Sequence, residues 1–149
     1  MTTALQSYAD RGVFRGFRAA PTTRGRVEYQ FLWLLRRPMR AVFDTRRSVL
    51  TFASLFPGVE ARSPMVVGLD DLVRSRTGRH QPAHKRMDGR RARVSSMVRR
   101  GDWSLVVTMR GANHEYAVRR ALNLINELFL SLHESWPEYL IERFGLSAE

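Results

Sequence analysis

Cysteine is absent from the 149-residue chain. Its absence excludes a disulfide framework, a thiolate nucleophile and a thiolate-bound metal. Long hydrophobic runs are absent too. The longest candidate, Phe31 to Leu35, stops at Arg36, far short of the ~20 residues that cross a bilayer. We therefore expect a soluble or at most peripheral protein.

Lysine is nearly missing, since Lys85 is the only one among 25 basic residues, which face 14 acidic ones and give a net charge of +11. Residues 1–62 and 63–112 each carry +7, whereas residues 113–149 carry −3. Such asymmetry favours attraction to polyanions or acidic proteins. Coding bias in a GC-rich genome, with the arginines simply solvated, accounts for the same composition, and both readings stay open.

The size predicts one domain, and the hydrophobic fraction of 44% with eight Phe predicts that it folds. Residues 1–26 hold five Arg but no continuous apolar segment of a secretory signal. We predict that they are an Arg-rich flexible tail of a bacterial cytoplasmic protein, with the domain at 27–149. The alternatives are a tail that packs Phe14 and Phe17 onto the domain, a short helix over Ala4 to Tyr8, an organelle transit peptide, or an RNA-binding segment.

A two-residue apolar period predicts strands over 27–35, 39–43 and 48–56, with Pro38 at a bulge, edge or turn. The third strand is apolar on both sides, so we expect it to be central and covered twice. Arg93–Arg99 and Trp103–Arg110 are joined by a short Gly-containing turn and predict an antiparallel hairpin.

Two helices follow from capping signals and the 3.6-residue period. Ser63-Pro64 opens a helix that runs to about Thr77, and Asn113 caps a long one. Pro137 should kink or restart the long helix before Gly145 ends it. The order predicts an α+β fold: an antiparallel sheet of four to five strands, with a long C-terminal helix and a shorter middle helix packed mainly on one face.

No catalytic or nucleotide-binding motif is present, and we expect no enzyme activity, cofactor or metal. His80 and His84 lie amid cations that repel a metal ion. Asn123 and Asn126 interrupt the apolar long helix, so they either form an exposed polar stripe or line a pocket against the sheet near Trp33.

The densest signal is a run of ten cations and one acid, Asp88, in residues 74–100. If they share a face, it suits nucleic-acid backbone or an acidic protein. The candidate polyanion-binding residues are Arg79, Lys85, Arg86, Arg90, Arg91, Arg93, Arg99 and Arg100.

In the order of its elements the chain resembles the small dimeric type III secretion chaperones, although those are characteristically acidic. We therefore expect a non-enzymatic protein-interaction or chaperone-like module that binds a protein partner or a second copy of itself. A nucleic-acid-binding protein that uses the arginines of residues 74–100 is the alternative, and an enzyme or small-ligand carrier is the third reading.

Overall fold

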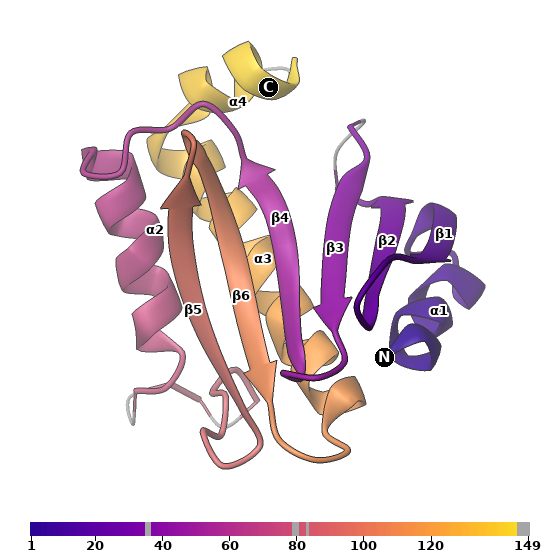
Figure 1. Cartoon of the computed structure of the whole chain (residues 1–149). Helices are drawn as coiled ribbons and strands as arrows, with labels where there is room; N and C mark the ends of the chain where they lie inside the picture. The colour runs from indigo at the N-terminus through magenta and orange to yellow at the C-terminus, as the bar shows by residue number, and fades with distance from the viewer. Residues whose placement is uncertain (35–36, 79–80, 83, 146–149) are drawn as a thin grey trace.

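The computed structural model describes residues 1–34, 37–78, 81–82 and 84–145, and Figure 1 shows the chain. The elements follow the order α1 (Thr2–Asp10), β1 (Arg15–Pro21), β2 (Arg26–Leu32), β3 (Met39–Asp44), β4 (Val49–Phe56), α2 (Pro64–Ser75), β5 (Ala92–Arg99), β6 (Asp102–Met109), α3 (His114–Ser135) and α4 (Pro137–Phe144). The predicted α+β class is confirmed.

The strands form one antiparallel sheet in the order β1-β2-β3-β4-β6-β5, which is one strand more than the upper prediction. The predicted hairpin is β5–β6. Its turn places Arg100 and Gly101 at φ values of 53° and 78°, the left-handed geometry of tight hairpin turns.

One face of the sheet carries the core, because the apolar residues alternate along each strand. In Figure 1, α3 runs behind β6 and β4, while α2 lies beside β5 and α1 beside β1. Phe56 of β4 meets Phe129 of α3 edge to face, with ring centroids 5.0 Å apart. The helices therefore pack on the same side, and the opposite face of the sheet is left open.

The long C-terminal helix is interrupted where the sequence predicts. α3 ends at Ser135, Pro137 opens α4, and Gly145 ends α4 with a φ of 64°. Asn113 occupies the N-cap position, but its side chain makes no capping bond. Its amide donates to the Arg110 carbonyl instead, so the predicted side-chain cap is wrong. None of the described helices is long and apolar enough to cross a membrane.

Residues 1–26 are not a tail outside the domain. They hold α1, which contains the short helix considered above, and β1, which is an edge strand. Leu5 and Phe14 are buried in the core, and Phe14 stacks on Phe31 at 4.1 Å. The N-terminal segment thus extends the sheet, and the predicted boundary at residue 26 does not exist in the fold.

β4 is central, as predicted, but it is covered by helices on one face only. Val49 and Ala53 lie half-buried on the open face. Leu55 and Phe56 are both buried because a bulge between Phe52 and Phe56 breaks the alternation. The burial of Leu55 therefore reflects the bulge and not a second layer, whereas Val49 and Ala53 are apolar positions of the open face.

The Asp70 carboxylate links α2 to the sheet by hydrogen bonds. Ser63 caps its first turn by accepting a hydrogen bond from the Val66 N–H, as predicted. Asp70 on α2 accepts hydrogen bonds from the Ser96 hydroxyl at 2.6 Å and the Trp103 indole N–H at 2.9 Å. Trp103 is fully buried, so Asp70 gives its N–H a partner inside the core.

We predict that Asp70→Ala lowers the free energy of unfolding by about 1–3 kcal/mol, because a buried indole N–H loses its acceptor. Urea denaturation followed by Trp fluorescence measures it. Asp71→Ala is the control, since Asp71 is exposed and pairs with the exposed Arg74, and it should change stability by less than about 0.5 kcal/mol. Equal effects of the two substitutions would contradict this role for Asp70.

Candidate functional site

The open face of the sheet is the largest functional candidate. We use this name for the strand side chains that point away from the helices. Val42, Thr51 and Val106 are half-buried there in neighbouring strands, and Met97 is 42% exposed. No aromatic side chain projects from the described strands on this side, because the strand aromatics all occupy core positions. The face is therefore small and apolar at its centre, and not a set of stacking platforms.

The register places small and apolar residues in a row across the strands. Val42 pairs with Thr51, Thr51 with Val106, and Val106 with Ser95. Arginines flank this row on both sides along the strand direction. Arg40 and Arg99 lie on one side of it, and Arg26 and Arg93 lie on the other. On β3, Arg40 lies four residues from Asp44, the residue that pairs with Arg26. Four residues span about 13 Å along a strand. A trough bordered by cations thus runs across the sheet.

A hollow of ≈ 630 Å³ occupies much of this face. We call it the basic hollow, and its charged lining consists of Arg26, Arg40, Arg47, Arg99, Arg100, Asp44 and Asp102. Backbone hydrogen bonds from Arg47 and Arg46 hold the pKa of Asp44 below its ordinary value. Arg99 and Arg100 have no hydrogen-bond or ion-pair partner among the described residues. Positive charge therefore predominates in the hollow, and these two guanidinium groups are free to meet a ligand.

Ser54, in the bulge of β4, lines the basic hollow next to Ala53, which pairs with Arg40. Ser54 has a φ of 51°, a left-handed conformation that is uncommon outside glycine. Its N–H donates to the Ser104 hydroxyl at 2.9 Å, and its own hydroxyl donates to the Asp102 carboxylate at 2.9 Å. The bulge is therefore held by side chains of β6. It ends the pairing of β4 with β3 after Ala53.

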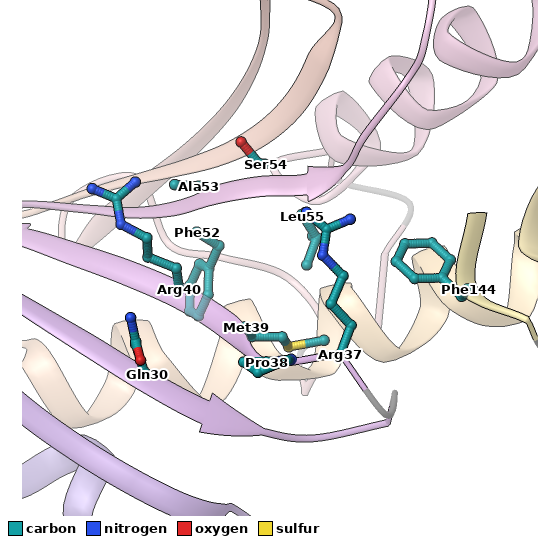
Figure 2. A pocket seen from close by; sticks show the side chains of 10 residues that line it. All are labelled: Gln30, Arg37, Pro38, Met39, Arg40, Phe52, Ala53, Ser54, Leu55 and Phe144. Atoms are coloured by element: carbon teal, nitrogen blue, oxygen red, sulfur yellow. The ribbon is translucent and has the colours of Figure 1, made fainter.

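Where that pairing ends, a second cavity of ≈ 360 Å³ opens between the start of β3, the end of β4 and α4. We call it the notch. Met39, Phe52 and Leu55 are buried beneath it, and Phe144 of α4 lines it. Figure 2 shows the side chains of Arg37 and Arg40 flanking the cavity on either side of Met39 and Phe52. The notch shares Arg40, Ala53 and Ser54 with the basic hollow, so the two form one continuous surface.

The basic run of residues 74–100 does not form one free patch. Lys85 pairs with Glu127 at 2.9 Å, Arg90 with Asp88 at 3.2 Å, and Arg91 donates to Asn113 at 3.0 Å. Arg86 is exposed in the loop after α2, Arg93 is exposed on β5, and Arg79 lies outside the described residues. Of the predicted cations that the structure describes, only Arg99 and Arg100 line the basic hollow.

Tyr116 of α3 holds part of the loop after α2 against the domain. The Arg91 guanidinium lies 3.7 Å above its ring, and its hydroxyl accepts from the Asp88 N–H at 2.8 Å. The Arg76 side chain is only 3% exposed and pairs with Glu127 of α3. Burial would raise the pKa of Glu127, but the hydrogen bond from Lys85 and the charge of Arg76 outweigh it and hold the pKa below the ordinary value.

The structure does not bring the three proposed pocket residues together. Asn123 and Asn126 are exposed on the side of α3 that faces away from the core. Trp33 follows β2 and packs edge to face on Phe14, with centroids 5.9 Å apart. None of the three lines the basic hollow or the notch. The polar positions of α3 therefore form the exposed stripe that was the alternative.

The arginines at 26, 37, 40 and 47 line the two cavities and were missed by sequence reasoning. Arg26, Glu28 and Gln30 alternate with the apolar residues of β2, and Arg40, Val42 and Asp44 do so in β3. That alternation assigns them to the face opposite the core. Together with the prediction that the helices pack mainly on one face, it indicates a solvated face, but it does not show which of these residues border a cavity, which depends on the strand order and the bulge.

Comparisons of the sequence with protein-family models, with curated proteins and with solved structures gave no significant match. Within the described part of the chain, no group of three or more His, Asp or Glu side chains is placed to hold a metal ion. The candidate function therefore rests on the geometry and charge of the open face.

We predict that Glu127→Gln lowers the free energy of unfolding at pH 7 by roughly 2–3 kcal/mol, because it leaves the buried Arg76 guanidinium without a carboxylate. The folded-state pKa of Glu127 is lowered, so its stabilising effect is complete above the unfolded pKa of about 4.3 and is lost as the pH falls through the folded pKa. Urea unfolding of both proteins between pH 3 and 7 measures the difference. A difference that does not shrink on acidification would contradict this role.

Proposed function

We propose that the protein is a non-enzymatic interaction module whose open face binds an acidic amphipathic helix of a partner protein. The single observation that carries this proposal is the trough across the sheet, with a small and apolar row between arginines at both strand ends. A helix with its side chains is about 10–12 Å across. The arginine-bordered sides of the trough are about 13 Å apart at β3 and roughly 20 Å apart at β5, between Arg93 and Arg99, so the trough is wide enough for one helix. Cytoplasmic location belongs to the same proposal.

The positive charge of the basic hollow favours an acidic helix over a basic or neutral one. Arg26, Arg40, Arg47, Arg99 and Arg100 line the basic hollow, against Asp44 and Asp102. Asp102 is engaged by Ser54, and Asp44 accepts the N–H groups of Arg46 and Arg47. A helix with a narrow stripe of Leu or Val flanked by Glu would place apolar groups over Val42 and Val106 and carboxylates beside the arginines.

A second copy of this chain offers a helix of related chemistry. Around α4 the exposed side chains include Glu134, Glu138, Glu142, Trp136 and Ile141. Self-association through this segment would occupy the open face with acidic and apolar groups. Sedimentation velocity over a range of protein concentrations separates the two sources, because only self-association makes occupancy of the open face depend on the concentration of this chain alone.

We predict that Arg99→Ser/Arg100→Ser weakens binding of a Glu-flanked, Leu-striped 18-residue helix roughly three- to tenfold, since two solvent-exposed ion pairs are removed. Fluorescence anisotropy of the labelled helix measures it, and binding should weaken further at high salt. The control Arg86→Ser/Arg119→Ser removes the same charge from exposed positions outside the hollow. The proposal fails if both variants lose affinity equally, or if the wild-type protein does not bind the helix.

Nucleic acid is the second candidate, favoured by the free guanidinium groups of Arg99 and Arg100. The open face lacks aromatic side chains in its described part, and these are what stack unpaired bases in open-sheet RNA-binding domains. We therefore predict no retention of random-sequence RNA or duplex DNA at ~150 mM salt. Tight binding of nucleic acid by the wild-type protein, with a smaller salt dependence in the Arg99→Ser/Arg100→Ser variant, would instead establish this alternative.

A further inference from the structure

The notch has the composition of a small-molecule site. Its floor is apolar, with Met39, Phe52 and Leu55 at most 6% exposed. Its volume of ≈ 360 Å³ lies within the range of roughly 300–1,000 Å³ that is typical of ligand pockets. It is formed by backbone geometry, because the bulge at Ser54 carries the end of β4 away from β3. The sheet supplies the floor of the cavity, and the connection between β2 and β3 supplies Arg37 and Pro38 at its side.

Positive charge dominates the mouth of the notch. No Asp or Glu lines it among the described residues, and both charged lining residues are arginines. Arg40 donates its Nε–H to Glu28 at 2.8 Å, so its charge is partly compensated. Arg37 has no hydrogen-bond or ion-pair partner among the described residues, and Figure 2 shows its side chain extending beside Leu55. One anionic group would therefore meet Arg37 first.

We propose that the notch binds a free carboxylic acid with an apolar chain. The chain lies on Met39, Phe52 and Leu55, and the carboxylate accepts hydrogen bonds from the Arg37 guanidinium, which matches its planar geometry. This site goes beyond the proposed partner-binding function. It shares Arg40, Ala53 and Ser54 with the basic hollow, so an acid bound in the notch contacts the same surface as a helix on the open face.

Decanoate is the probe, titrated into protein labelled with ¹³C at the methionine methyl groups. Met39 lies under the notch, whereas Met87 is a buried residue of the loop after α2. The Met39 signal should shift saturably while that of Met87 stays unchanged. Octanoate should bind about tenfold more weakly, because two methylene groups are no longer buried, and decanol should bind more weakly than decanoate because it lacks the charge.

Arg37→Gln should weaken decanoate binding at least fivefold without changing decanol binding, and Arg37→Lys should recover part of the loss. Arg100→Gln is the matched control, since it removes one exposed arginine that lines only the basic hollow.

No Met39 shift at millimolar decanoate, equal binding of decanol, or an equal loss in Arg100→Gln would overturn the proposal. So would tighter binding of acetyl-Gly-Gly-Leu-Leu with a free carboxyl terminus, which would assign the notch to a peptide end. Helix binding by Arg37→Gln tests the open face separately, because Arg37 does not line the basic hollow.

Discussion

The packing of α3 against one face of the sheet is the contact on which the rest of the structure depends. The apolar side of α3 includes Ile125, Leu128 and Phe129, and all three are buried with the core residues of β4 and β6. Because strand side chains alternate, this burial commits every second residue of the sheet to the core and every other one to the opposite face. α1 and α2 pack on the side of α3 as well. The sheet is consequently left with one face that none of the four described helices covers.

The second determinant is local, and it lies at Ser54. Between Phe52 and Phe56, β4 holds more residues than the facing part of β6, so the strand must bulge. The left-handed φ of Ser54 and its bonds to Ser104 and Asp102 hold the bulge in one shape. The consequences reach both cavities: Leu55 turns into the core, the β3–β4 pairing ends, and the notch opens beside the basic hollow. One irregular residue thus connects the fold to both candidate sites.

The parts of the fold that depend on short-range signals were predictable. Ser63 as a cap, Pro137 as an interruption and Gly101 in a hairpin turn act within a few residues of their own positions, so their neighbours in sequence suffice. β1 was missed because Gly16 and two alanines give the edge strand little strand propensity. Lys85 and Arg91 pair with Glu127 and Asn113, which lie far away in the sequence, so these pairs depend on tertiary contacts. Together with the local pair of Arg90 and Asp88, they explain why the charge pattern overstated the free basic surface. Asn123 and Asn126 were ambiguous because they adjoin the apolar stripe of α3, and only the packing shows that they face outward.

An uncovered sheet face is the central claim, and the absence of cysteine makes it directly measurable. A single Thr51→Cys substitution places one thiol at the centre of the open face, and Ala121→Cys places one on the buried side of α3. The decisive measurement is the rate of thiol modification in each variant under native conditions. The account predicts fast modification at position 51 and modification at position 121 only through unfolding. Protection of position 51 equal to that of position 121 in the isolated protein would contradict it.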